Sequence, residues 1–566
     1  METMSSKSSQ RSWSDRVRAL PRKAWQFDLR LTGLNNHVVI CGLGRIGVQL
    51  ARDVHEAGAA GGLVVIERDR NNHHIATCRR LGAAVLIGDA ADPAMLRRAR
   101  VERASQVFAV CGDDSTDVMI AVRLCNLLAR RAGEAGRGRE RPARPLGCFV
   151  HIVDEALKEL FVRHPLLMLA RNRQVNVKVF NVFTNSARLL IREHLAKDQQ
   201  QPSPGRRPKE NEVAHYVVVG FGQMGQAFAL EAARLAHFEN HKRLRMTIID
   251  DKDDPQRDRF LARYPRFCPS SLSLERFDPA ADDWASKQYR PDAPYQVADD
   301  RAVEYACNAE FLEMPPAFRA DLLADRIARR QDAPSVCPRI IVCLDDDRRN
   351  FEAAVLLRTK LDDRGKNAPI YAWLPVETGL TELLRTGNGP AGTAIGGVIP
   401  FGICEQSCNL EEIIRPGSEE LARAVHEYYR ERFPHPAKPS SKPWDELIEP
   451  YRTSNFLVAE HLGIKLSVIG QRRVREEEAP ADRPRDTIAE HEERLLGQME
   501  HNRWLAQQLL DGWRYAPERH DERKQDPDLC AWKHLPPERQ NRDFEQVRRI
   551  PEILKKLPQR ECIVPD

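Results

Sequence analysis

One short pattern occurs twice in this chain and constrains its fold more than any other feature. Residues 37–47 read HVVICGLGRIG, and residues 215–225 read HYVVVGFGQMG. Each is an apolar run typical of a buried strand, followed by glycines at G-x-G-x-x-G spacing and then by residues with helical periodicity. Further along, residues 107–124 resemble residues 340–357. Because both patterns recur in the same order, we expect two related domains in tandem.

Both copies alternate apolar runs with helical segments. The expected strands are residues 38–41, 63–66, 84–87, 107–110 and 149–153 in the first copy, and 216–219, 246–249, 340–343 and 370–373 in the second. Alternating strands and helices predict a parallel sheet with helices on both faces. The expected fold class is therefore α/β, with two tandem doubly wound Rossmann-like domains followed by a mainly α-helical C-terminal domain.

A chain of 566 residues is too long for one ordinary domain. Breaks in composition predict a basic leader (1–34), a first Rossmann-like domain (35–196), a linker (197–212), a second Rossmann-like domain (213–433), a linker (434–443) and a helical domain (444–566). The first pair of motifs is offset by 178 residues and the second by 233, so the second copy carries about 55 extra residues. We expect these as surface excursions within residues 251–338, which are rich in Pro, Asp and Arg.

Composition narrows the class of protein. A net charge of +5 spread over the whole chain argues against a dedicated nucleic-acid binder, so no nucleic-acid partner is expected. No apolar run approaches the roughly 18 residues that a membrane span needs, and the N-terminus lacks the apolar core of a signal peptide. None of the 13 cysteines forms a C-x-x-C pair, so no metal is expected. We expect a cytoplasmic protein, or one held at the membrane periphery through a partner.

The first glycine turn predicts a dinucleotide-type site. Gly42 permits the tight turn, Gly44 lets a pyrophosphate approach the backbone, and Gly47 lets the helix pack against the strand. The free amides at the helix N-terminus then face the phosphates. Glu67 lies 20 residues beyond Gly47, where a carboxylate accepts hydrogen bonds from ribose and repels the extra phosphate of NADP. NAD(H) or an adenine nucleotide is the expected cofactor.

The second copy keeps the same frame. Gly220, Gly222 and Gly225 repeat the spacing, and Asp250 follows 25 residues beyond Gly225. This site either binds nucleotide or is a pseudo-copy retained for packing against the first copy. Both alternatives stay open.

The first copy resembles the RCK/TrkA-N domains, NAD-binding domains that gate potassium channels and transporters in response to bound nucleotides. The resemblance covers roughly residues 35–195 and rests on the glycine turn, on Glu67 and Asp69, on Gly88-Asp89-Ala90 with Leu96 and Ala104 after it, and on Asp113-Asp114. It implies that Glu67 holds the adenosine ribose and that Gly88 and Asp89 flank the adenine. The candidate cofactor-binding residues of the two copies are then Gly42, Gly44, Arg45, Ile46, Gly47, Glu67, Asp69, Gly88, Asp89, Gly220, Gly222, Gln223, Met224, Gly225 and Asp250.

The chain departs from the RCK/TrkA-N pattern at three points. Where the family often has Asn, three residues after the Asp, the first copy has Asp117 and the second has Asn350. The second copy has no evident Gly-Asp-Ala equivalent. No part of the chain clearly matches the separate C-terminal ligand domain of the family.

The C-terminal part combines helical periodicity with aromatic and basic residues. Residues 500–504, 512–515 and 532–535 resemble the ryanodine-receptor repeat (RyR) domain, over roughly residues 490–560. Aromatic faces stack purine bases and Arg pairs with phosphate, so a nucleotide messenger such as a cyclic nucleotide is the expected ligand here. The candidate pocket consists of Arg503, Trp504, Trp513, Arg514, Tyr515 and Trp532. The alternative is that the tryptophans form the core of a small helical domain.

These features favour a non-catalytic sensor. Nucleotide in the Rossmann clefts and a ligand in the RyR-like domain would act on a partner, such as a potassium channel or transporter subunit, or on a second-messenger pathway in stress or antiviral defence. One alternative is an NAD-dependent oxidoreductase or nucleotide-processing enzyme that uses His151 or His164, although neither has an orienting carboxylate at motif spacing. Another is an assembly scaffold with vestigial sites. Because the RCK family commonly dimerises through its Rossmann domains, a homo-oligomer is expected.

Overall fold

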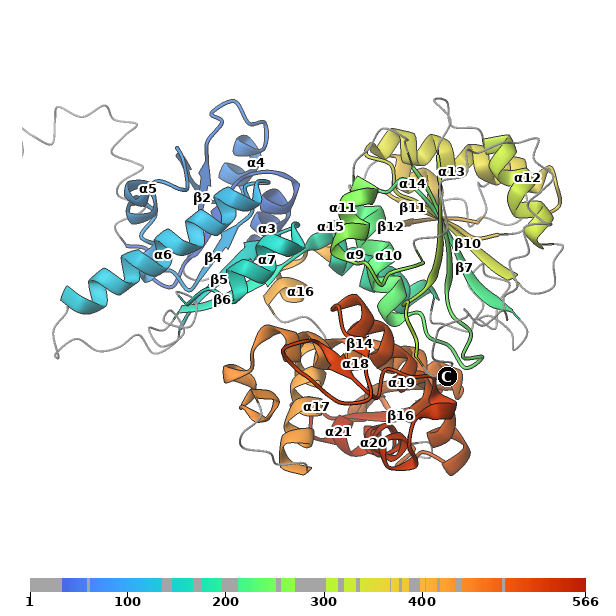
Figure 1. Cartoon of the computed structure of the whole chain (residues 1–566). Helices are drawn as coiled ribbons and strands as arrows, with labels where there is room; N and C mark the ends of the chain where they lie inside the picture. The colour runs from blue at the N-terminus through green and yellow to red at the C-terminus, as the bar shows by residue number, and fades with distance from the viewer. Residues whose placement is uncertain are drawn as a thin grey trace, which may run out of the picture. The chain divides into compact units, whose positions relative to one another are not determined.

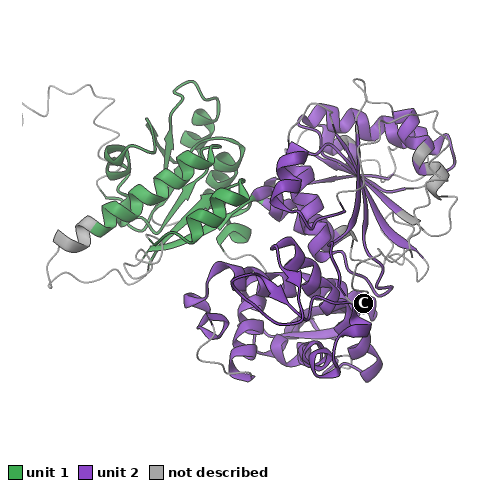
Figure 2. Ribbon diagram, in the orientation of Figure 1, with its two compact units in different colours: residues 1–181, 408–414 green, residues 182–407, 415–566 purple. Residues whose placement is uncertain are grey.

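The computed structural model describes most of both repeats and of the C-terminal part (Figure 1). The described residues are 33–58, 62–134, 145–165, 175–195, 212–250, 256–269, 302–313, 320–331, 336–366, 368–375, 379–385, 397–402, 404–414, 418–432, 439–480 and 484–566. Nearly all of the expected leader and of the first linker lies outside them. The chain divides into two compact units, one of residues 1–181 and 408–414 and one of residues 182–407 and 415–566 (Figure 2).

The first repeat forms a six-stranded parallel sheet in unit 1. Its strands are β1 (Val38–Cys41), β2 (Leu63–Glu67), β3 (Ala84–Ile87), β4 (Gln106–Ala109), β5 (Leu146–His151) and β6 (Val175–Phe180), in the order β3-β2-β1-β4-β5-β6. Its helices include α3 (Arg45–Glu56), α4 (His74–Arg80), α5 (Pro93–Arg98), α6 (Asp114–Glu134) and α7 (Glu155–Val162). Val38 and Ile40 point into one core and Val39 and Cys41 into another, so both faces are covered. The order reverses between β1 and β4, where a doubly wound sheet opens its crevice.

The second repeat builds the same sheet in unit 2. Its strands are β7 (Val213–Val219), β8 (Arg245–Asp250), β9 (Asn308–Glu313), β10 (Val336–Val342), β11 (Ile370–Trp373) and β12 (Val398–Phe401), in the order β12-β11-β10-β7-β8-β9, all parallel. Its helices include α10 (Gln223–Leu235), α11 (Gln256–Arg263), α12 (Ala320–Gln331), α13 (Asp347–Asp362) and α14 (Gly379–Arg385). The predicted pair of doubly wound α/β domains is confirmed.

The segment expected to hold surface excursions, residues 251–338, contains part of this sheet. Strand β9 lies within it and pairs with β8 along its whole length. Leu323 and Ile327 of α12 are buried in the core of the second sheet. The extra length of the second copy therefore lies mainly between β8 and β9, and the expectation of surface excursions is wrong for β9 and α12.

Each unit contains a helix that follows the last strand of the other repeat. Helix α9 (Val182–Leu190) follows β6 but packs on α10 in unit 2. Helix α16 (Leu410–Ile414) comes after β12 but packs on α3 in unit 1. There the Leu410 amide donates to Asp53 Oδ2 (2.8 Å), and Ile413 is buried in the same core as β1. The units therefore do not coincide with the boundaries expected at residues 196 and 213.

Because Ile413 completes the core of unit 1, Ile413→Ala is expected to destabilise the first sheet. Removing a buried Ile side chain costs about 2–4 kcal/mol. The measurement is hydrogen exchange of the β1 and β4 amides in the full chain, which should speed up, while Leu356→Ala, at a side chain 51% exposed on α13, should leave them unchanged. Unchanged exchange in the Ile413 variant would contradict the assignment of α16 to unit 1.

The C-terminal part is mainly helical and shares one core with the second sheet. Its elements are α17 (Glu419–Arg432), α18 (Glu449–Val468), α19 (Glu490–Leu510), α20 (Pro537–Arg548), α21 (Ile550–Lys555), and an antiparallel pair of β13 (Gln471–Arg475) with β16 (Glu561–Pro565). Helices α18 and α19 pack on α10, and the His461 ring donates to the His237 carbonyl (3.1 Å). Helix α17, expected in the second Rossmann-like domain, packs on α18 and α21 instead. Among the described helices, none has the length and apolar character needed to span a bilayer.

Candidate functional site

The glycine turn of the first module has one closed side and one open side. Gly42 has φ of +97°, and a Cβ there would lie 2.6 Å from the Val110 carbonyl oxygen. A Cβ on Gly47 would lie 2.1 Å from the Gly42 carbonyl oxygen, so both positions require glycine. Gly44, the N-cap of α3, has no heavy atom within 4 Å of where its Cβ would be. The space above Gly44, at the N-terminus of α3, is therefore open to a phosphate group.

Glu67 fixes the shape of this turn. Its carboxylate accepts hydrogen bonds from the Leu43 amide (2.8 Å), the Asp69 amide (2.7 Å) and the Asn72 side chain (3.2 Å). The Asn72 side chain also donates to the Leu43 carbonyl (3.0 Å). Sequence reasoning missed Asn72, because nothing in its spacing from the glycines marks it. Two carboxylate oxygens can accept about four hydrogen bonds, so Glu67 keeps capacity for a ribose hydroxyl.

The remaining candidates of the first module lie at the ends of β2 and β3. Asp69 and Asp89 are exposed, and each accepts a local backbone hydrogen bond, from Asn71 and Ala91 respectively. The Gly88 amide donates to the Glu67 carbonyl (2.9 Å). Since β1, β2 and β3 are neighbours in a parallel sheet, their carboxyl ends place the glycine turn, Glu67 and Asp89 along one edge.

The second repeat has the same glycine turn and the same acidic residue after its second strand, but the space above its second glycine is not open. Gly220 has φ of +94°, and the Phe221 amide donates to Asp250 Oδ1 (3.0 Å), as Leu43 does to Glu67. A Cβ on Gly222, however, would lie only 2.8 Å from Asp345 Oδ1. The corresponding residue of the first module is Gly112, which has no side chain. A carboxylate beside the turn repels phosphate, so the two sites differ in charge where they share a backbone.

The first helical residues after each turn have similar environments. Arg45 and Gln223 are exposed, whereas Ile46 is half-buried and Met224 is buried in the core. The Met224 side chain therefore packs inside the protein, whereas that of Ile46 packs against the core and stays partly accessible.

The two histidines considered for proton transfer lie in different surroundings. His151, at the end of β5, is buried against the Phe180 ring, and burial lowers its pKa to about 4. It is therefore neutral near pH 7. His164, just after α7, is exposed. Among the described residues, no group of three or more His, Cys, Asp or Glu side chains is arranged to hold a metal ion.

The six residues expected to form the RyR-like pocket do not form one site. Trp504, Trp513 and Tyr515 gather around Leu505, Leu509 and Leu529, and the Arg519 guanidinium lies 5.3 Å from the centre of the Trp513 ring. Arg514 is exposed beside them. Trp532 lies outside that leucine cluster, and its ring contacts those of Phe544 and of His501, which also contacts Trp504. The expectation of a single six-residue pocket is wrong for Arg503, which is buried, whereas the aromatic trio of Trp504, Trp513 and Tyr515 is brought together.

Arg503 is separated from the aromatic trio because it belongs to a buried ion cluster. It is 1% exposed, donates to Glu500 (2.8 Å) and to Gln507 (2.8 Å), and Glu500 also accepts from Lys465 (2.6 Å). Burial alone would raise the pKa of Glu500, but the guanidinium of Arg503 and the ammonium of Lys465 lower it overall. Arg503 therefore neutralises a buried carboxylate and is not available to a phosphate.

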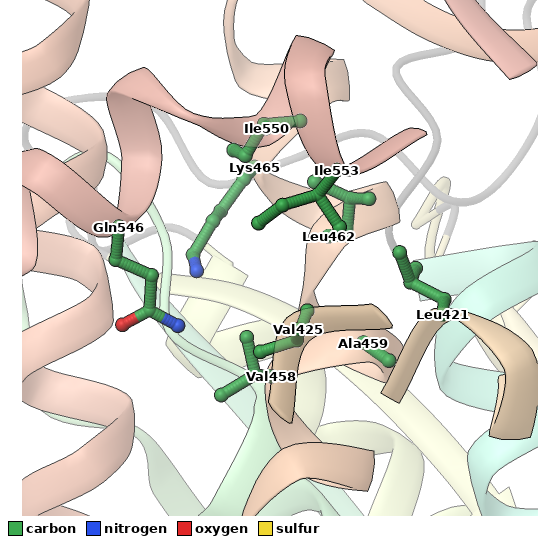
Figure 3. Close-up of a pocket in the computed structure, with 9 residues that line it drawn as sticks. All are labelled: Leu421, Val425, Val458, Ala459, Leu462, Lys465, Gln546, Ile550 and Ile553. Carbon is green, nitrogen blue, oxygen red and sulfur yellow. The ribbon is translucent and has the colours of Figure 1, made fainter. Parts of the chain in front are cut away.

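A cavity lies beside this ion cluster (Figure 3). Its lining is apolar except for Lys465 and Gln546, whose polar ends lie on the same side in the figure, and it consists of Leu421, Val425, Val458, Ala459, Leu462, Lys465, Gln546, Ile550 and Ile553. The cavity volume of about 20 Å³ is enough for roughly one water molecule. No nucleotide fits there without rearrangement of the helices.

Comparison with known proteins finds similarity in the first repeat. Residues 38–132 match the family model of the TrkA-N domain. The first repeat is therefore similar to a TrkA-N domain over these residues and is called the TrkA-N module. Over 93 residues the chain is 29% identical to potassium channel protein 1 of Methanocaldococcus jannaschii, a match that covers 16% of this chain and 27% of that protein. The chain thus spans about a quarter of the length of this relative.

Solved structures with a detectable likeness include those of GsuK. The structure of GsuK bound to ADP aligns with a TM-score of 0.37 at 16% identity, covering 68% of this chain and 70% of that one. The GsuK channel bound to NAD aligns with a TM-score of 0.38 at 13% identity, covering 86% and 73%.

Proposed function

We propose that the TrkA-N module is a non-catalytic receptor for NAD(H) or an adenine nucleotide. Binding of the nucleotide would change how the protein acts on a partner. The observation that carries this proposal is the open space above Gly44, next to the Glu67 carboxylate, which accepts a hydrogen bond from the Leu43 amide in the turn. The α3 amides would hold the phosphates. Glu67 would accept from the ribose and disfavour NADP, and Gly88 and Asp89 would flank the adenine.

Occupancy of this site can reach the rest of the chain through α3. The N-terminus of α3 faces the proposed phosphates, and α16 packs on the same helix. Because α16 belongs by sequence to the segment that leaves the second sheet, a shift of α3 acts directly on that segment. Helix α17 follows α16 along the chain and packs in the C-terminal part. Ligand binding in the first module would in this way bias the arrangement of the C-terminal helices.

We expect one nucleotide per chain, because Asp345 disfavours phosphate in the second module. The test is calorimetric titration of the full chain with NAD and with ADP. Asp345→Gly, which restores the residue type of Gly112, should add a second binding event, and this event should persist when Gly44→Asp removes the first. Two equivalent sites in the unmodified chain would contradict the role of Asp345. Failure of both nucleotides to bind would contradict the receptor function.

For the partner we propose a potassium channel or transporter subunit, since the relative with the matching segment is a potassium channel protein. The C-terminal RyR-like part would bind a second ligand, such as a cyclic nucleotide at the aromatic trio, or contact the partner in a stress or antiviral response. The full chain would act as a homo-oligomer.

The test of the channel or transporter partner is to isolate the tagged chain from detergent-solubilised membranes with and without NAD. Recovery of a channel or transporter subunit only in one condition supports the proposal, and recovery of none in either contradicts it.

A further inference from the structure

The two modules differ at one buried position next to the turn. Asn350, in the first turn of α13, is fully buried and makes three hydrogen bonds. Its Oδ1 accepts from the Leu344 amide (2.6 Å), and its Nδ2 donates to the carbonyls of Leu344 (2.9 Å) and Trp373 (3.0 Å). The side chain thereby joins the loop after β10 to the end of β11, with its donor facing two acceptors.

Asp117 occupies the equivalent position of the TrkA-N module, in the first turn of α6. It is fully buried, and its Oδ1 accepts from the Cys111 amide (2.8 Å), as Asn350 does from Leu344. Its Oδ2, however, has no hydrogen-bond partner. The strand registers Val107↔Cys148 and Ile340↔Ile370 make Cys111 and His151 the counterparts of Leu344 and Trp373. Oδ2 therefore takes the place of an NH₂ group that donates to carbonyls.

This chemistry distinguishes the two protonation states of Asp117. A carbonyl oxygen only accepts hydrogen bonds, so an ionised Oδ2 cannot bond to one, whereas a protonated carboxyl can donate as Asn350 does. Burial raises the pKa of Asp117 to about 7, against the amide and the thiol of Cys111, which both lower it. Several titratable groups face Asp117: Cys41 on β1, Cys111 and Asp113 in the loop after β4, Asp114 at the start of α6, and Cys148 on β5. Two further carboxylates, Glu67 and Asp89, face Cys111.

The loop that Asp117 holds is the closed side of the nucleotide turn. A Cβ on Gly42 would lie 2.6 Å from the Val110 carbonyl oxygen and 2.7 Å from the Cys111 Cα, so loop and turn are in direct contact. We propose that Asp117 is a proton-dependent positioning residue of the TrkA-N site, whose neutral form holds the loop of residues 110–113, and through it the glycine turn, in the shape that binds nucleotide. This proposal rests on the proposed receptor function.

The sign of the effect follows from which form binds. Below about pH 7 Asp117 is neutral and the turn is held, and as the pH rises above that value the competent fraction falls. Between about pH 6 and about pH 8 this fraction drops about tenfold, so the apparent Kd for NAD should rise about tenfold. Asp117→Asn, which copies Asn350, should bind tightly over the whole range. Glu56→Gln, at an exposed carboxylate at the C-terminal end of α3, is the matched control and should keep the wild-type pH profile, because Glu56 is not among the charges that face Asp117.

The experiment is calorimetric titration of the full chain with NAD across this pH range, in buffers of different ionisation enthalpy. NAD is the probe because its pyrophosphate has no proton that titrates near neutrality. The expected result is proton uptake on binding near and above pH 7 in the wild type and the Glu56→Gln variant, and none in Asp117→Asn. Binding that is equally pH-independent in all three proteins would overturn the role of Asp117 and leave the receptor function standing. If NAD binds to none of them at any pH, both proposals fail together.

Discussion

Glu500→Ala is expected to lower the free energy of unfolding of the C-terminal part by about 3–5 kcal/mol, because it removes the carboxylate to which two buried cations donate hydrogen bonds. Lys465 and Arg503 are each 1% exposed, and Glu500 is their shared partner on α19. Neither side chain can reach water without opening the packing of α18 and α19. Since the same helices pack on α10, we expect the second sheet to lose stability as well.

The measurement is urea unfolding of the full chain, with hydrogen exchange of α19 to locate the transition. Glu490→Ala is the control on the same helix, because the pair of Glu490 with Arg494 is exposed and should contribute less than about 1 kcal/mol. If both variants lose equally little, the cluster contributes no more than a surface pair. Because the pKa of Glu500 is lowered in the fold, its contribution should be present at neutral pH and be lost in acid, below its unfolded pKa of about 4.3.

Gly44→Asp should have opposite effects on stability and on binding. The Gly44 backbone is extended (φ −77°, ψ −166°) and its surroundings are open, so a side chain fits without strain. Gly44 is the N-cap of α3, where Asp is preferred over Gly by a few tenths of a kcal/mol. The new carboxylate would, however, occupy the place of the phosphates. We therefore expect an unchanged or slightly raised melting temperature and a fall in NAD affinity of at least about 100-fold, or roughly 3 kcal/mol.

Thermal melting with and without NAD separates the two effects. Gly44→Ala is the control, because it adds a side chain without charge and should lose less affinity than the Asp variant. A variant that melts much earlier than wild type would contradict the open geometry above Gly44. Retained NAD affinity in Gly44→Asp would place the phosphates elsewhere.

The strands that are continuous apolar runs could be predicted from the sequence, and these include the edge strand β3, whereas the other three edge strands could not. The bounds of β1, β3 and β11 agree with the expected runs, because these strands are buried on both faces and read as continuous apolar segments. The strands β6, β9 and β12 lie at sheet edges, where polar residues alternate with apolar ones or a proline interrupts, and none was expected.

The glycine frame and Glu67 were also evident from spacing, because the backbone of such a turn admits few alternatives. The difference between the modules was not, since the approach of Asp345 to Gly222 depends on the path of a separate loop. Arg503 was assigned to a ligand because its neighbours in sequence are aromatic. Its true partner, Glu500, lies one helical turn earlier on the inner face of α19, which composition alone does not reveal.

The helices α9 and α16 make the two repeats depend on each other for their packing. Each repeat is followed, in sequence, by a helix that packs on the first helix of the other repeat, so neither repeat expressed by itself carries all the apolar surface that packs on its own sheet. A gene that lost one copy would lose the closing helix of the copy it kept. Loss of either repeat would therefore remove a helix that packs in the other, whether one repeat or both bind a ligand. The second module, with its acidic turn, could in this way be preserved as a structural counterpart while its own site changes freely.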